Sequence, residues 1–282
     1  MVELASGILS PMPQINTPTR TSKPWKLVWH DEFTGRIGSR PRGTRWTYDI
    51  GNEGWGNKEL EVYTDHRENA HIVADPDAGG GKALAITALR TAAGGYTSAR
   101  LKTQDRCEWT YGRFEGRIKI PGSPGCSVAS CQGVWPAFWL LGNDIETKNW
   151  PRCGEIDIME WIGSEPGKLH ATLHGPGYCG DKGLHGVVAL PARRRYHGEY
   201  HVFAVEWSAS VIQWFLDGVL YHTVARADLP AGKKWVFDHP FFLIINLAIG
   251  GSWPGYPTDA TLFPQSLHVD YIRVYEANCL EP

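Results

Sequence analysis

The stretch that most constrains the fold of this chain is GEIDIMEW at residues 154–161, where three carboxylates interrupt apolar sequence. Successive side chains of a β-strand point to opposite faces, so Glu155 and Asp157 share one face while the isoleucines point into a core. Strict alternation would turn Glu160 towards that core. A one-residue bulge around residues 158–159 restores the parity. The pattern therefore predicts a bulged strand with three acids on one face.

The spacing of these acids suits glycoside hydrolysis. With the bulge counted as one position, the backbones of Glu155 and Glu160 lie roughly 13 Å apart at about 3.3 Å per residue. Side chains that lean towards each other across a concave sheet shorten this gap towards the ~5–5.5 Å that a retaining glycosidase needs. Two carboxyl groups at such a short distance have different pKa values, because their negative charges repel. This favours one ionised and one protonated group.

The rest of the chain favours an all-β fold class. Thirteen Trp, eleven Tyr and 32 Gly with little helical periodicity indicate aromatic-rich strands joined by glycine turns. Residues 58–64 alternate, with Leu60 and Val62 on one face and Glu59 and Glu61 on the other. No repeat and no βαβ pattern is evident. We expect one β-sandwich domain over residues 24–282, after a flexible Pro/Ser/Thr-rich arm over residues 1–23.

Charge and hydropathy exclude several classes of partner. A net charge of -2 gives no reason to expect nucleic acid or an anionic membrane, so a neutral partner fits better. No run of eighteen apolar residues is present to span a membrane. The N-terminus lacks the basic region and long apolar core of an export signal. We expect a secreted or periplasmic protein whose export signal is absent from this chain.

Aromatic residues and a histidine flank the acidic motif. GVWPAFWLLG at residues 133–142 places Trp135 and Trp139 on one strand face. Such rings usually fill a core, but near the acids they favour stacking on a sugar. If the following hairpin closes near Glu165, Asp157 falls opposite His174 to within one position. A lone strand histidine is more often structural, but beside a carboxylate it suits orienting that group or contacting a sugar.

Six cysteines leave the disulfide pattern open. Only Cys126 and Cys131, five residues apart in a Gly/Ser/Pro loop, are local candidates for a bridge. No CxxC occurs, so zinc and redox functions have little support.

Taken together, the motifs resemble those of bacterial laminarinases in glycoside hydrolase family 16. The resemblance covers roughly residues 25–276 and rests on WHDEF, GWGNKELEVYT, YTSARL, YGRFEGRIKIP, VWPAFWLLG, GEIDIME, TLHGPG, NLAIGGSWPG and VDYIRVYE, in the family's order. The acidic motif has the longer, bulged form of the laminarinase-like members.

This resemblance implies a β-jelly-roll sandwich of two curved antiparallel sheets with a concave substrate cleft. It implies retaining endo-hydrolysis of β-1,3-glucosidic bonds in laminarin-type glucans, with mixed-linkage β-1,3-1,4-glucan as a further candidate substrate. Glu155 would be the nucleophile, Glu160 the general acid and base, and Asp157 the partner that tunes them. The implied substrate-binding residues are Asn57, Arg100, Trp135, Trp139, His174 and Trp253.

The resemblance also implies a calcium ion on the convex side, with Glu32 and Asp270 as its side-chain ligands. No cofactor is expected for catalysis, and a monomer is expected. The alternatives are a non-catalytic β-glucan-binding protein, an enzyme acting on agarose or carrageenan, transfer of glucan to a sugar acceptor, and a metal-binding acid cluster without catalysis.

Overall fold

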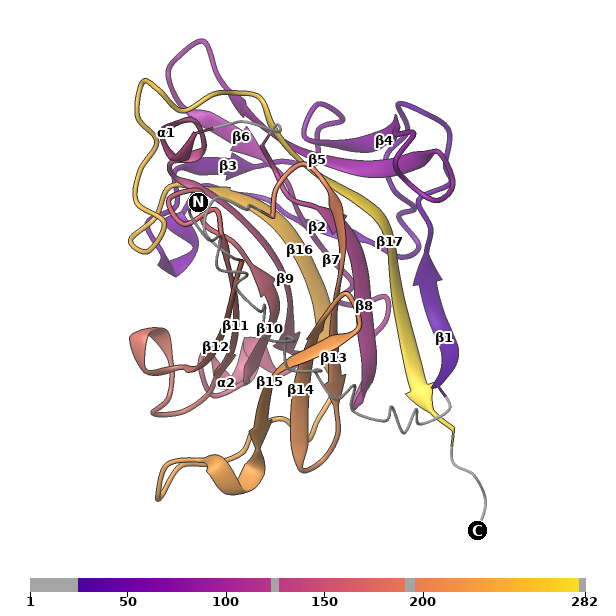
Figure 1. Ribbon diagram of the computed structural model, residues 1–282, viewed down its shortest axis with the longest axis vertical. Helices are drawn as coiled ribbons and strands as arrows, with labels where there is room; N and C mark the ends of the chain where they lie inside the picture. The colour runs from indigo at the N-terminus through magenta and orange to yellow at the C-terminus, as the bar shows by residue number, and fades with distance from the viewer. Residues whose placement is uncertain (1–24, 123–126, 191–195, 279–282) are drawn as a thin grey trace, which may run out of the picture.

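The computed structural model describes residues 25–122, 127–190 and 196–278, which form two packed β-sheets (Figure 1). Every strand pair is antiparallel except β3 (Glu61–Tyr63) with β6 (Tyr96–Ser98), which is parallel. The predicted all-β jelly-roll class is confirmed.

The larger sheet has ten strands. Eight of them run in the order β15 (Val219–Ala225), β14 (Val211–Leu216), β13 (Tyr200–Trp207), β8 (Gly112–Lys119), β17 (Gln265–Ala277), β5 (Lys82–Arg90), β6 and β3. The remaining two are β1 (Trp25–Asp31), which pairs with β17, and β4 (Ala70–Ala74), which pairs with β5.

The smaller sheet has seven strands and carries the acidic motif. Its order is β12 (Leu184–Ala189), β11 (Lys168–His174), β10 (Glu155–Glu160), β9 (Val134–Gly142), β16 (Phe241–Ile249), β7 (Arg100–Lys102) and β2 (Thr47–Asp49). The long strands β9 and β16 bend along their length, so this sheet is visibly curved (Figure 1).

Helical segments are short. They are η1 (Gly54–Gly56), α1 (Val128–Cys131), α2 (Ile145–Lys148), η2 (Gly180–Lys182) and η3 (Arg226–Asp228). Within the described ranges, no helix has the length and apolar character needed to cross a membrane.

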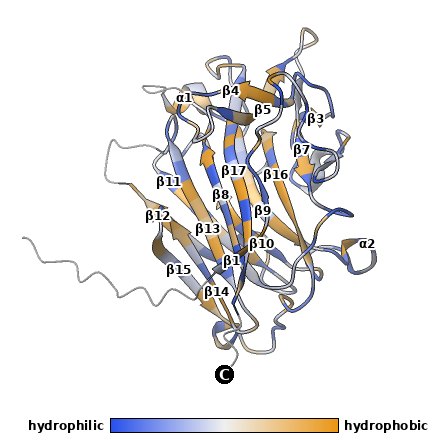
Figure 2. Ribbon diagram, turned by 90° about the vertical axis from the view of Figure 1, so that its right-hand side faces the viewer, coloured by the Kyte–Doolittle hydropathy of each residue, from blue (hydrophilic) through white to orange (hydrophobic). Residues whose placement is uncertain are grey.

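The core lies between the two sheets, where alternate side chains of facing strands interlock. Strand β8 alternates strictly between buried and half-buried residues, so that Phe114 and Ile118 point inwards. From the other sheet, Phe138 and Ile156 join the same apolar cluster. Figure 2 shows apolar residues concentrated along the strands of both sheets. Strand periodicity thus divides each strand into two faces, one packed in the core and one available for a site.

One turn has the Asp-Gly sequence that is typical of a two-residue β-hairpin and that predicts one here. Asp217 and Gly218 both adopt positive φ, of 50° and 80°, and join β14 to β15 as a two-residue hairpin. Residues 1–23 and Cys126 lie outside the described residues. The flexible arm and the Cys126–Cys131 bridge therefore stay predictions.

Candidate active site

Strand β10 contains the predicted bulge. On its β9 side, Asp157 pairs with Trp139 and Met159 pairs with Phe138, which leaves Ile158 without a partner position. The pairing with β11 also shifts between Asp157 and Glu160. The extra residue resets the alternation, so the prediction of a one-residue bulge is confirmed.

The bulge separates acids from apolar side chains as expected. Ile156, Ile158 and Trp161 are at most 1% exposed and belong to the core between the sheets. Glu155 is half-buried, whereas Asp157 and Glu160 are 3% and 9% exposed. The three acids therefore lie on the face of the seven-stranded sheet that points away from the core, in a largely desolvated environment.

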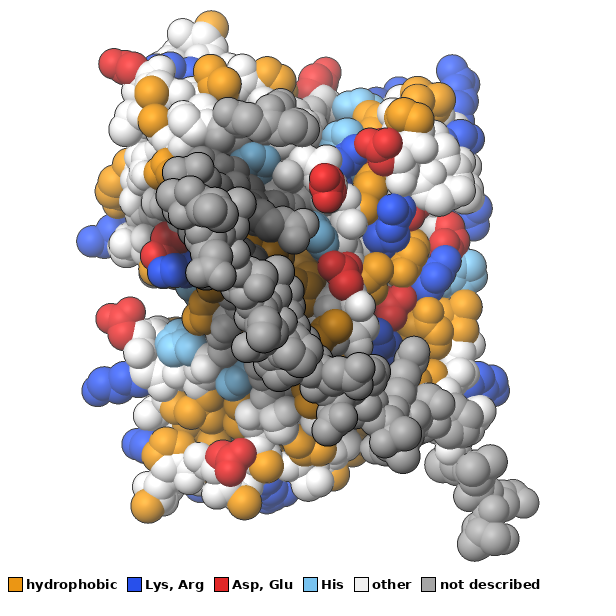
Figure 3. Space-filling view, in the orientation of Figure 1, with side chains coloured by type: hydrophobic (Ala, Val, Ile, Leu, Met, Phe, Trp, Pro, Cys, Tyr) orange, Lys and Arg blue, Asp and Glu red, His pale blue; other side chains and the backbone are white. Residues whose placement is uncertain are grey.

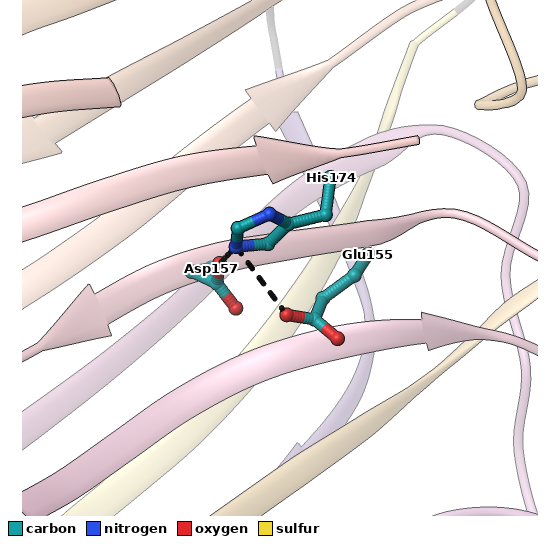
Figure 4. A group of neighbouring side chains, drawn as sticks. All are labelled: Glu155, Asp157 and His174. Atoms are coloured by element: carbon teal, nitrogen blue, oxygen red, sulfur yellow. Dashed lines mark ion pairs between the residues drawn. The ribbon is translucent and has the colours of Figure 1, made fainter. Parts of the chain in front are cut away.

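The predicted register of His174 was wrong, although its predicted proximity to Asp157 was right. Across the β10–β11 ladder His174 lies opposite Glu155, and Asp157 lies opposite Thr172. The turn and the bulge together shift the pairing of β10 with β11 by two residues from the predicted register. Because the shift is even, His174 stays on the same face of the sheet as Asp157. His174 Nε2 lies 3.2 Å from Asp157 Oδ2 and 3.7 Å from Glu155 Oε1 (Figure 4).

Each glutamate of the motif receives a hydrogen bond from an indole. Trp135 donates its Nε1–H to Glu160 Oε1 at 3.2 Å, and Trp150 donates its Nε1–H to Glu155 Oε2 at 3.0 Å. Trp135 was a predicted site residue, but Trp150 was missed. Its only sequence signal is a Trp-Pro pair just before the acidic strand, in a connection without periodicity.

Further aromatic rings extend this surface. Trp253 is 43% exposed, and its ring lies edge-on to Trp135 at 5.4 Å and to His170 at 5.0 Å. His170 lies opposite Glu160 on β11 and was also missed. Partly exposed indoles beside carboxyl groups offer a sugar ring both stacking surface and hydrogen bonds.

Arg100 lies at the other side of Trp139. Its guanidinium lies 4.7 Å from the Trp139 ring centre and 4.9 Å from that of Trp55, and it forms an ion pair with Asp49 at 2.9 Å. Trp55 is a third aromatic residue that the sequence did not single out.

Asn57 connects to Trp139 through a buried polar chain. Asn57 Nδ2 donates to Glu59 at 2.9 Å, and Tyr63 donates its hydroxyl to the other oxygen of Glu59 at 3.0 Å. Asn246 donates to that hydroxyl at 3.0 Å and accepts from Trp139 Nε1–H at 2.9 Å. The structure thus links predicted substrate residues from two separate segments.

Burial raises the pKa of all three acids. For Glu155 burial raises the pKa to about 8, with a further increase from Asp157, while His174, Arg100 and Trp150 act in the opposite direction. For Glu160 burial again dominates, and Asp157 raises the pKa further. Burial also raises the pKa of Asp157. Because three anions cannot share a desolvated site, this arrangement favours a mixture of ionised and protonated groups.

The predicted calcium ligands lie in a pocket of their own that also contains Arg117 and Arg273. Both oxygens of Glu32 pair with Arg273 at 2.8 Å, which is the main reason for the lowered pKa of Glu32. Asp270 accepts from the Gly79 amide at 3.1 Å and pairs with Arg117 at 2.5 Å. These side chains do not form the open oxygen cage that calcium prefers. Calcium stays a prediction, and no step below depends on it.

Two glutamates, one half-buried and one buried, lie beside exposed indoles on one face of a jelly-roll sheet. This arrangement defines the class of this protein as a polysaccharide-cleaving glycoside hydrolase. The model of glycosyl hydrolases family 16 matches residues 54–273. The chain belongs to this family.

Individual relatives of this chain support the same family. The chain is 42% identical to a beta-glucanase of Rhodothermus marinus, over 89% of this chain and 85% of that protein. Among solved structures, the catalytic domain of a laminarinase from Thermotoga petrophila is 42% identical with a TM-score of 0.79, covering 91% of this chain and 100% of that one. The endo-β-1,3-glucanase of Pyrococcus furiosus is 43% identical with a TM-score of 0.78, covering 89% and 94%. The predicted family is confirmed.

Proposed function

We propose that this enzyme cleaves internal β-1,3-glucosidic bonds of laminarin-type glucans with retention of anomeric configuration. The observation that carries the proposal is the bulge of β10, which places Glu155 and Glu160 on one face on either side of Asp157. The β-1,3-glucanase and laminarinase activities named for the relatives support the choice of bond.

In the first step, Glu155 attacks the anomeric carbon while Glu160 gives its proton to the glycosidic oxygen. The bond between carbon and oxygen breaks, the leaving chain departs as an alcohol, and a glycosyl-enzyme forms on Glu155. Burial raises the pKa of Glu155, but His174, Arg100 and the indole N–H of Trp150 lower it again, and this partial compensation suits a nucleophile that must be ionised. Burial and the charge of Asp157 favour a protonated Glu160, which suits an acid.

In the second step, the now ionised Glu160 takes a proton from water as that water attacks the anomeric carbon. The bond to Glu155 breaks, so two inversions give net retention. His174 Nε2 lies close to both Asp157 and Glu155. Asp157 and His174 therefore influence which of the two glutamates is ionised. Trp135, Trp139 and Trp253 offer stacking surfaces for the glucan.

A neutral glucan also fits the charge of the surface. On the face viewed in Figure 3, Lys and Arg side chains are interspersed with Asp and Glu over the described surface. A sulfated polysaccharide such as carrageenan would favour a strongly basic surface. Because laminarin is too large to enter a cell intact, we further propose that the enzyme acts outside the cytoplasm, as a secreted or periplasmic protein. We also propose that it is a monomer.

The experiment that tests this function compares wild-type protein with Glu155→Ala on laminarin, lichenan, agarose and carrageenan. Wild type is expected to release oligosaccharides of mixed length from laminarin, and the variant to lose turnover by about 10³-fold or more while still binding laminarin. Glu68→Ala, which changes an exposed glutamate, is the matched control.

NMR of the first product should show the β-anomer. An initial α-anomer would contradict retention, and laminarin binding without products in wild type would favour the glucan-binding alternative.

A further inference from the structure

Three potential ligand atoms of the active site converge on one point. One oxygen of Glu155, one of Asp157 and a ring nitrogen of His174 all lie within 4.8 Å of one another. Figure 4 shows the two carboxylates of β10 and the imidazole of β11 directed towards one another. Two carboxylates and an imidazole form a donor set that transition metals bind well.

The separations suit direct coordination. A zinc ion binds nitrogen and oxygen ligands at about 2.0–2.2 Å, so a tetrahedral site places neighbouring ligand atoms about 3.3 Å apart. The distances from His174 Nε2 to Asp157 Oδ2 and to Glu155 Oε1, 3.2 Å and 3.7 Å, lie on either side of that value. Two of the three separations therefore already suit coordination, and the third is at most 4.8 Å.

The buried oxygen of Asp157 also lacks a hydrogen bond. Asp157 is 3% exposed, yet Oδ2 has no hydrogen-bond partner among the described residues, although it lies against His174. A buried oxygen that accepts no hydrogen bond is costly, and a cation would satisfy it. Trp150 meanwhile holds the other oxygen of Glu155, so that Oε1 is left to face the cluster.

We propose that Glu155, Asp157 and His174 bind one divalent transition-metal ion, such as zinc, in competition with glucan, so that the ion inhibits the enzyme. The imidazole nitrogen favours zinc, copper or nickel over calcium and magnesium, which prefer oxygen ligands. The competition rests on the proposed function, because the same acids serve the sugar, whereas metal binding itself does not.

The second ring nitrogen of His174 limits the affinity. Nδ1 has no hydrogen-bond partner in the described part of the chain. Histidine ligands of tightly bound metals normally donate that N–H to a second group. The site is therefore that of a reversible inhibitor rather than of a resident cofactor.

The test is calorimetric titration of zinc chloride into metal-free protein in a non-chelating buffer, with and without a laminarin oligosaccharide. One saturable zinc ion per chain is expected, and its binding should disappear when the oligosaccharide is saturating. In laminarin hydrolysis, zinc should raise the apparent KM and leave kcat unchanged. Zinc that binds only at places insensitive to the oligosaccharide overturns the proposal.

Variants locate the ion. Asp157→Asn and His174→Gln should each weaken zinc binding by about 10-fold or more. The matched control is His201→Gln, because His201 lies 2.8 Å from Asp217 and this pair belongs to no three-ligand group among the described residues. Zinc affinity should be unchanged in this control. Circular dichroism checks that each variant folds, and the oligosaccharide competition in wild type needs no variant.

The outcomes separate the two proposals. Wild-type zinc affinity in both site variants, or no saturable binding in wild type, overturns the metal site while leaving glucan hydrolysis untouched. Zinc binding at this cluster in a protein that cleaves none of the glucans overturns the proposed function alone.

Discussion

Trp150 donates its indole N–H to Glu155 at 3.0 Å from a connection that none of the sequence motifs includes. On the other glutamate of the pair, Trp135 makes the equivalent bond to Glu160. Each acid is thus held by an aromatic side chain that also offers stacking surface. The two bonds come from different segments, so the orientation of one acid can be altered without touching the other.

Trp150→Phe should lower kcat on laminarin by roughly 5-fold to 10-fold, with a smaller change in KM. The substitution keeps an aromatic ring but removes a hydrogen bond to a carboxylate, which contributes about 1–1.5 kcal/mol at a half-exposed position. Trp150→Ala should raise KM as well, because the stacking surface is also lost. Steady-state kinetics on both variants gives the comparison. A wild-type kcat in Trp150→Phe would show that the bond has no catalytic role.

Asp157→Asn should shift the bell-shaped pH profile of activity to lower pH, besides lowering kcat. The charge of Asp157 raises the pKa of both Glu155 and Glu160, although burial is the larger cause for each. Removing that charge lets both glutamates ionise at lower pH, so both limbs of the profile move in the same direction.

The measurement is kcat/KM for laminarin across the pH range. Asp65→Asn, at a side chain that is 42% exposed, is a control that should leave the profile unchanged. A shift to higher pH would contradict the assigned sign.

Tyr63→Phe should raise KM for laminarin several-fold and lower the free energy of unfolding by about 1–3 kcal/mol. The hydroxyl of Tyr63 links Glu59 to Asn246, which in turn orients Trp139. Its loss removes one hydrogen-bond partner each from Glu59 and Asn246, and so loosens the amide that accepts the Trp139 N–H.

The matched control is Tyr48→Phe, because the buried Tyr48 hydroxyl has no hydrogen-bond partner among the described residues. Chemical denaturation and kinetics of both variants provide the readout. Equal KM values for the two variants would exclude a positioning role for the chain of hydrogen bonds.

Glu61→Gln should reduce the loss of stability that accompanies rising pH. Glu61 is fully buried, and burial together with Glu59 raises its pKa far above the ordinary value of 4.5. A raised folded-state pKa stabilises the fold below the unfolded-state pKa, and that contribution is lost as pH rises towards the folded-state value. Glutamine imitates the protonated form at every pH.

Denaturation at about pH 5 and about pH 8 should therefore show a gain of the variant over wild type that grows by about 1.4 kcal/mol per pH unit at most. Glu68→Gln, at an exposed position, should show no such trend. A difference between Glu61→Gln and wild type that is constant with pH would contradict the shift.

Residues 58–64 show how far alternation reaches. The sequence places Glu59 and Glu61 opposite Leu60 and Val62, and the structure confirms this division. The glutamates, however, are buried, while Leu60 and Val62 are 44% and 37% exposed. The alternation of side chains between two faces is a property of the strand itself. Which of the two faces is buried depends on residues far away in the chain that pack against it. Here Ile249 donates its N–H to Glu61, and Tyr63 donates to Glu59.

The sequence by itself determined the all-β class, the bulge of β10, the shared face of Glu155, Asp157 and Glu160, and the hairpin at Asp217-Gly218. These follow from strand alternation and turn conformation, which operate within a few neighbouring residues. The tertiary structure alone decided that His174 lies opposite Glu155 and that Trp150 donates a hydrogen bond to Glu155. It also decided that Glu32 pairs with Arg273 and Asp270 with Arg117. Such contacts depend on ladder register and on segments far apart in sequence, which local periodicity does not encode.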